Sequence, residues 1–327
     1  MLLAVAAVGA ALAAPSPTLA QLVGQKLVVR MDGTTPSASL LARARRGEIG
    51  GVILFRFNVA SSARLRAATA SLQRAAAEGG RPKLLIAVDQ EGGSVRTIPF
   101  APPAASPRSV RAPRAEGRRT GRALRSLGVN VDLAPVADLP SPSSFIDSRT
   151  WPTTRSARAF AAGLRDGGVT PTLKHFPGLA FATRNTDHYV VRVTASRKQL
   201  EPGLQPYRRT RVPLVMLSNA VYDAYDRFNA AGWSRRIGNR LLRDELGFEG
   251  VTISDSLDGA AHARGIPTDP LAVRAARAGT DLILVTGSEA ASRSVYLSLL
   301  RAAREGRIRM GDLRGSYGRI LKLKSGL

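Results

Sequence analysis

The chain has 327 residues, of which 44% are apolar and 22% are charged, and it contains no cysteine. This composition is sufficient for a large folded core and excludes disorder along most of the chain. The absence of cysteine excludes disulfides, thiolate metal ligands and a cysteine nucleophile. With only three histidines, we expect no multi-histidine metal centre.

The formal net charge is +24 and comes mainly from arginines scattered along the chain. Such charge suits nucleic acid, anionic membranes or acidic polymers such as cell-wall glycans. The two densest clusters, Arg43–Arg46 and Arg108–Arg125, are not interleaved with aromatic residues, which single-strand binding requires. The sequence therefore does not indicate a nucleic-acid partner.

Residues 1–14 form an Ala/Leu/Val run that ends in small residues, before Pro15-Ser16-Pro17. The pattern resembles a secretory signal peptide and predicts export, although the usual basic leader is missing. The alternative is a frayed N-terminal helix. The run is too short to cross a bilayer, which takes about 20 apolar residues, and we expect no stable membrane span elsewhere.

From Leu22 onward, short β-branched runs alternate with Ala/Leu/Arg-rich segments, as βα units do. The predicted strands are Lys26–Val29, Gly51–Leu54, Leu84–Val88, Asn130–Ala134, Thr170–Leu173, Pro213–Leu217, Gly250–Ile253 and Asp281–Val285. The predicted helices are Ser37–Arg46, Ala60–Ala77, Ala115–Leu127, Arg155–Gly167, Arg235–Leu246, Leu271–Ala278, Ser292–Glu305 and Met310–Leu323.

Eight strands with helices between them predict an α/β fold, a (β/α)₈ TIM barrel, as one domain over residues 15–327. A doubly wound sheet is the alternative, but no G-x-G-x-x-G follows the first strand. In a barrel of this kind, chemistry takes place at the C-terminal ends of the strands.

Polar residues follow four of these strands. They are Asp89-Gln90-Glu91, Lys174-His175, Ser218-Asn219 and Ser254-Asp255-Ser256. The carboxylates, the ammonium group, the imidazole and the amide should therefore converge on one mouth of the barrel.

The strand-end segments resemble glycoside hydrolase family 3, in its single-barrel bacterial β-N-acetylglucosaminidase branch. The resemblance is carried, in order, by Gly50–Phe55, Ala87–Gly93, Gly128–Asp138, Lys174–Gly178 and Leu246–Asp255. It implies a retaining glycosidase that acts without a cofactor on β-linked N-acetylglucosamine or a related β-glycoside, with peptidoglycan fragments among its substrates.

The resemblance also implies residue roles. Asp255 matches the catalytic nucleophile, Asp89 matches a group that holds sugar hydroxyls, and Lys174 and His175 match a pair that binds the sugar ring. Arg149, within Ile146–Trp151, resembles a substrate-binding arginine more loosely. Physical chemistry supports these roles, because charged groups make the stronger hydrogen bonds to hydroxyls.

The expected general acid is where the sequence departs from the family. The branch reads K-H-F-P-G-H-G and then D-S-H, whereas this chain has Leu179-Ala180 and then Asn185-Thr186-Asp187-His188. Three alternatives follow: His188 is the acid, Asp187 is the acid, or the acid is lost and the barrel only binds carbohydrate. A β-glucosidase or β-xylosidase of the same family is a further alternative.

Five other residues are given structural interpretations. We expect Glu91 to bond neighbouring backbone or an arginine, Asp138 to support the site or a turn, and His262 to be solvated. Trp151 and Trp233 could stack on sugar, but tryptophan is more often packed in a core.

Overall fold

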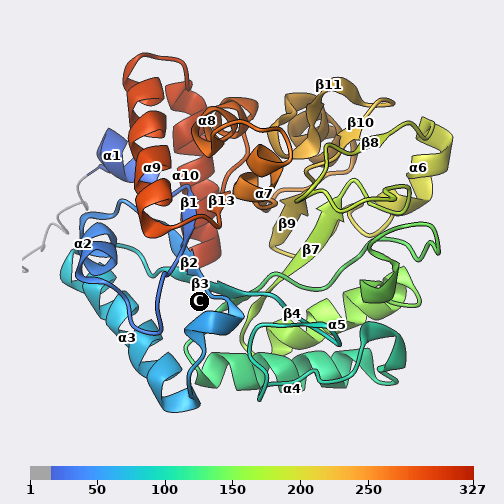
Figure 1. Ribbon diagram of the computed structural model, residues 1–327, viewed down its shortest axis with the longest axis horizontal. Helices are drawn as coiled ribbons and strands as arrows, with labels where there is room; N and C mark the ends of the chain where they lie inside the picture. The colour runs from blue at the N-terminus through green and yellow to red at the C-terminus, as the bar shows by residue number, and fades with distance from the viewer. Residues whose placement is uncertain (1–15) are drawn as a thin grey trace, which may run out of the picture.

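The computed structural model describes residues 16–327, in which eight parallel strands form a nearly closed barrel surrounded by helices (Figure 1). The barrel strands are β1 (Leu27–Arg30), β2 (Gly51–Ile53), β3 (Leu85–Val88), β6 (Val131–Asp132), β7 (Thr170–Phe176), β9 (Leu214–Leu217), β12 (Val251–Ser254) and β13 (Ile283–Val285). They lie in the order β12-β9-β7-β6-β3-β2-β1-β13, and an Ile253–Leu282 bridge joins the two ends. The predicted (β/α)₈ barrel is confirmed, and the doubly wound alternative is wrong.

Successive residues of each barrel strand point alternately into two apolar environments. Val28 points into the barrel, where it packs in one cluster with Ile53 and Leu85. Its neighbours Leu27 and Val29 belong to the cluster that lies between strands and helices. Both faces of each strand are buried, which explains why the sequence shows continuous apolar runs.

The helices cover the outside of the barrel (Figure 1). They are α1 (Leu19–Gly24), α2 (Ala38–Arg46), α3 (Ser62–Glu78), α4 (Pro113–Ser126), α5 (Thr154–Asp166), α6 (Arg197–Leu204), the π-helix η5 (Arg236–Glu245), α7 (Leu257–His262), α8 (Thr268–Ala278), α9 (Glu289–Arg304) and α10 (Met310–Lys324). All eight predicted helices are present, with ends shifted by up to three residues. None of the helices within residues 16–327 is both long and apolar enough to cross a membrane.

The structure differs from the prediction in the end of one strand, in three helices that were not predicted and in two small sheets. Strand β7 continues through Lys174 and His175, which were expected to follow it, and its register against β9 shifts between Leu173 and Phe176. Helices α1, α6 and α7 were not predicted: α1 and α7 have only six residues each, and Pro202 interrupts the pattern of α6. The prediction also lacked the hairpin β4 (Gln90–Gly92)–β5 (Val95–Arg96) and a small sheet of β8 (Arg192–Val193), β10 (Val221–Tyr222) and β11 (Asp226–Ala230).

The predicted signal-like segment, residues 1–14, lies outside the described residues and stays a prediction.

Candidate active site

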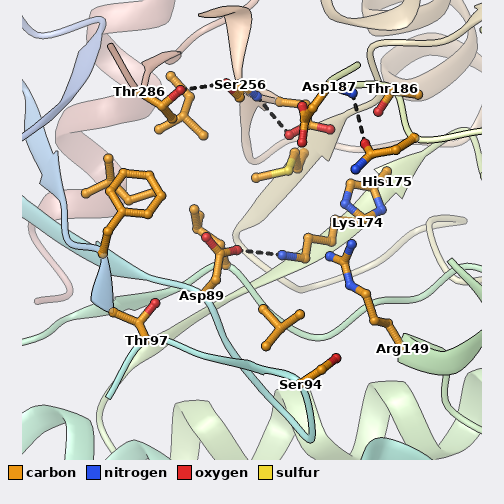
Figure 2. Close-up of a pocket in the computed structure, with 18 of the residues that line it drawn as sticks. Asp89, Ser94, Thr97, Arg149, Lys174, His175, Thr186, Asp187, Ser256 and Thr286 are labelled. Carbon is orange, nitrogen blue, oxygen red and sulfur yellow. Dashed lines mark hydrogen bonds and ion pairs between the residues drawn. The ribbon is translucent and has the colours of Figure 1, made fainter. Parts of the chain in front are cut away.

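A cavity of about 560 Å³ opens at the C-terminal ends of the barrel strands. Six of the seven residues predicted for the site line it: Asp89, Arg149, Lys174, His175, Asp187 and Asp255. Figure 2 shows two sides of this cavity, with Asp89 and Arg149 on one side and Asp187 and Ser256 on the other. The strand-end rule therefore correctly predicted that these side chains share one cavity, and their roles stay predictions.

Lys174 is enclosed between two carboxylates. Its Nζ lies 2.7 Å from Oδ1 of Asp89 and 2.6 Å from Oε1 of Glu91. Arg149 donates from Nε to Oε2 of Glu91 (2.8 Å) and from Nη2 to Oε1 (2.6 Å). The charges of Lys174 and Arg149 are thus balanced by those of Asp89 and Glu91. Glu91 contacts both cations and holds them in place.

The buried charges are held ionised by one another. Burial by itself would raise the pKa of Glu91, but Lys174 and Arg149 outweigh burial and lower this pKa to about 2. Burial would likewise lower the pKa of Lys174, yet Asp89 and Glu91 raise this pKa above its usual range. Asp89 therefore faces a permanent ammonium group and, being less buried than Glu91, presents its carboxylate to the cavity.

His175 is oriented by Asp138. The Nδ1 of His175 lies 2.8 Å from Oδ2 of Asp138, and the backbone N–H of His175 donates to the same oxygen. Oδ1 of Asp138 accepts the backbone N–H of Leu179 at 2.8 Å. Asp138 therefore supports the imidazole and the start of the next loop, in agreement with the expected supporting role.

Asp255 follows β12 and has its backbone tied to β9, because its N–H donates to the carbonyl of Leu217 at 2.9 Å. Its Oδ1 accepts the backbone N–H of Ser256 at 2.8 Å. Ser256 Oγ lies 2.7 Å from Oγ1 of Thr286, which follows β13. Asp255 is thus held at the junction of three strand ends and lines the cavity.

Asp187, in the loop after β7, lines the same cavity as Asp255, and Figure 2 shows it beside Ser256, the residue after Asp255. Burial, and secondly the negative charge of Asp255, raise the pKa of Asp187 to about 7. Its Oδ1 is buried and accepts no hydrogen bond within the described part of the chain. This carboxyl group can therefore carry a proton near neutral pH, as a general acid must.

His188 is exposed and is not among the residues that line the cavity. The structure thus separates the two adjacent candidates for the acid. His262 is exposed at the end of α7, as expected. Trp151 and Trp233 are both buried, 2% and 5% exposed, which agrees with packing.

The sequence interpretation missed the residues that form the rest of the wall. Phe55, Arg56 and Phe57 follow β2, the hairpin contributes Ser94–Thr97, and Thr286 follows β13. The rings of Phe55 and Phe57 are nearly parallel, with centroids 5.9 Å apart, and Phe57 is 52% exposed. These residues also follow strands, so the same strand-end rule, applied to every strand, would have identified Phe55–Phe57 and Thr286.

Comparisons with known proteins agree with this geometry. The family model for the glycosyl hydrolase family 3 N-terminal domain matches residues 18–323. A secreted glycosyl hydrolase of Arthroderma benhamiae is 33% identical, over 97% of this chain and 97% of its own length. A β-hexosaminidase of Alkalilimnicola ehrlichii is 34% identical, over 79% of this chain and 80% of its own.

Two solved structures have the same barrel. A family 3 β-N-acetylglucosaminidase from Paenibacillus superposes with a TM-score of 0.90 at 31% identity, covering 95% of this chain and 63% of that protein. A β-N-acetylhexosaminidase from Beutenbergia cavernae gives a TM-score of 0.86 at 28% identity, covering 95% of this chain and 99% of that one. With its barrel, its strand-end carboxylates and this family match together, the chain belongs to glycosyl hydrolase family 3.

Proposed function

We propose that the chain hydrolyses β-linked N-acetylglucosamine with retention of anomeric configuration, using Asp255 as nucleophile and Asp187 as acid/base. The observation that carries the proposal is the placement of Asp187 in the cavity beside Asp255, with its pKa raised to about 7. A retaining enzyme needs two such groups, one ionised and one protonated. The relatives named β-hexosaminidase and β-N-acetylglucosaminidase support the choice of sugar.

In the first step, a carboxylate oxygen of Asp255 attacks the anomeric carbon while the C–O bond to the leaving group breaks. The Asp187 carboxyl gives its proton to the departing oxygen. The Asp255 ester carries no charge, so the repulsion that, after burial, contributed to the raised pKa of Asp187 is lost. Asp187 is then a carboxylate that removes a proton from the attacking water, and hydrolysis of the ester returns Asp255 to its starting state.

The ion-paired cluster binds the sugar in this mechanism. Asp89 accepts hydrogen bonds from sugar hydroxyls, Lys174 and Arg149 donate to them, and Nε2 of His175, opposite the nitrogen that faces Asp138, also hydrogen-bonds to a hydroxyl. These groups are fixed by Glu91 and Asp138 before substrate arrives, so little ordering is needed on binding.

Leaving-group dependence tests the assignment of Asp187. Asp187→Ala should lose on the order of 10²- to 10⁴-fold in kcat/KM on substrates with poor leaving groups, and much less on nitrophenyl N-acetylglucosaminide. His188→Ala is the matched control and should behave as wild type. If His188→Ala, rather than Asp187→Ala, shows the selective loss, His188 is the acid and the assignment is wrong.

A test of the nucleophile and of the barrel's role as an enzyme uses the activated substrate alone. Asp255→Ala should abolish its cleavage, and the first-formed product of wild type should be the β-anomer by NMR. Wild type that cleaves no activated glycoside of N-acetylglucosamine, glucose or xylose would leave only the carbohydrate-binding alternative.

We further propose that the leaving-group side accepts a sugar with an acidic substituent, as in peptidoglycan fragments. Phe57 lines the cavity with an exposed ring, and Arg30 lies over that ring at 5.6 Å. Arg56 lines the cavity and has no ion-pair partner within residues 16–327. Arg56→Gln should therefore raise KM for a disaccharide whose leaving sugar carries a carboxylate, and leave KM for its neutral counterpart unchanged. Equal effects on both would refute a charge-specific contact.

Export is proposed on the Ala/Leu/Val run at residues 1–14 and on the secreted relative of Arthroderma benhamiae. N-terminal sequencing of the protein recovered from culture medium tests it. A mature protein that begins after residue 14 is expected, and retention in the cell with Met1 intact would contradict export.

A further inference from the structure

The side chain of Asp187 packs against Gly259, where any other residue would place a Cβ atom in contact with it. A Cβ built on Gly259, in α7, would lie 2.5 Å from Oδ1 of Asp187 and 2.9 Å from its Cβ and Cγ. We propose that Gly259 is a positioning residue for the acid/base, setting by its missing side chain how closely Asp187 approaches Asp255. This inference rests on the proposed role of Asp187.

Rotation of the Asp187 side chain would not relieve the contact. Rotation about χ1 moves Cγ and Oδ1 but leaves Cβ where the backbone holds it. Carbon atoms in contact normally lie about 3.5–4.0 Å apart, so a methyl group at residue 259 must displace the loop backbone by roughly 0.5–1 Å. The acid itself would therefore move out of position.

Gly259 is also connected to the nucleophile. Its N–H donates to Oγ of Ser256 at 3.1 Å, and the N–H of Ser256 donates to Oδ1 of Asp255. Asp258 anchors the same helical turn by accepting the N–H of Thr286 at 2.5 Å. The distance between acid and nucleophile is thus set through one short, braced segment, with Gly259 at its contact with Asp187.

The glycine has no conformational reason to be in this helix. Gly259 lies within α7, and its backbone is not in the positive-φ region that favours glycine. Alanine is the better residue in a helix. The space occupied by Asp187 therefore explains the glycine, and the backbone geometry does not.

The test is Gly259→Ala, compared with Gly318→Ala in α10, where an added Cβ has open space. Gly259→Ala should lower kcat/KM about 10- to 100-fold on poor leaving groups, because misplacement by about 1 Å has effects of that size. On nitrophenyl N-acetylglucosaminide the loss should stay within a few-fold. In the kcat/KM of Gly259→Ala on poor leaving groups, the alkaline limb of the pH profile should move to lower pH, since Asp187 would be farther from Asp255. Gly318→Ala should match wild type in all three measurements.

A double-mutant cycle separates this inference from the proposed function. In an Asp187→Ala background, Gly259→Ala should cause no further loss, because no carboxyl group remains to be displaced. If Asp187→Ala shows the selective loss but Gly259→Ala does not, the inference alone is overturned. If Asp187→Ala shows none, the assignment of the acid fails first. An equal loss from Gly259→Ala on good and poor leaving groups, or in the Asp187→Ala background, would indicate a structural defect and overturn the positioning role.

Discussion

At the scale of single residues, the sugar-binding side of the cavity depends on a carboxylate that itself has little access to substrate. Glu91 has only 1% of its side chain exposed and contacts both Lys174 and Arg149. Removing its charge would leave the buried Lys174 and the partly buried Arg149 with Asp89 as their remaining anionic neighbour. Buried ion pairs are costly to break because the surviving charge stays desolvated.

Glu91→Gln should therefore lower the free energy of unfolding by about 3–5 kcal/mol and raise KM. Urea denaturation and steady-state kinetics measure the two effects. Glu78→Gln is the control, since Glu78 pairs with Arg45 at the surface, where the side chains are 56% and 49% exposed. This variant should lower the free energy of unfolding by less than about 1 kcal/mol. If both variants lower the free energy of unfolding equally, burial does not make the Glu91 ion pairs more important for stability than the surface pair.

Asp187 should make stability depend on pH. Its pKa is raised from 3.8 to about 7 in the folded chain, so between these values the folded state binds more protons than the unfolded state. The stabilising effect of the proton is complete below about pH 4 and is lost as the pH rises toward 7. Asp187→Asn should therefore be more stable than wild type above pH 7, by at most about 4 kcal/mol.

That difference should disappear near pH 4, as measured by urea denaturation across the range. An Asp187→Asn variant that is less stable than wild type at pH 8 would mean that the ionised carboxylate is stabilised in the folded state.

At the scale of elements, α4 and α5 pack through glycines. A Cβ on Gly163 would lie 2.1 Å from the carbonyl oxygen of Arg114, and one on Gly117 would lie 2.2 Å from that of Phe160. Figure 1 shows these helices side by side beneath the barrel. Backbone atoms oppose backbone atoms here, so no side chain can turn away to make room.

Gly163→Ala should destabilise the fold by about 1–3 kcal/mol, although alanine is the better helix former. Thermal or urea denaturation measures it, and Gly318→Ala, exposed in α10, should be neutral or stabilising. If Gly163→Ala is also stabilising, the two helices do not pack as closely as described.

The elements also show what a sequence can and cannot reveal. The barrel strands were predictable because both faces of each are buried, which leaves continuous apolar runs such as Leu84–Val88. The hairpin β4–β5 was not, because its residues are held by tertiary contacts, such as Gln90 donating to the carbonyls of Ile98 and Ala101. Similarly, spacing suggested that Asp187 and His188 were equivalent. Only the path of the loop directs Asp187 into the cavity and leaves His188 exposed.

At the scale of the whole molecule, the net charge of +24 must be accommodated by a folded chain. The surface cleft between η5, α8 and the α9–α10 connection is lined by arginines that include Arg236, Arg274 and Arg309. Within residues 16–327 these three have no ion-pair partner. Like charges so placed repel one another in the folded state and separate on unfolding.

Salt should therefore stabilise this protein. Screening lengths fall to about 10 Å at 0.1 M ionic strength, so Tm should rise between 10 mM and 150 mM NaCl, measured by calorimetry. Arg274→Gln should raise Tm by about 1–2 °C at low salt, and that gain should shrink at high salt. Arg235→Gln is the control, because Arg235 pairs with Asp312 at 2.6 Å and donates to the carbonyl of Arg277; it should give no gain. If Tm falls as salt is added, the attractive pairs outweigh the repulsion, and the excess charge does not limit stability.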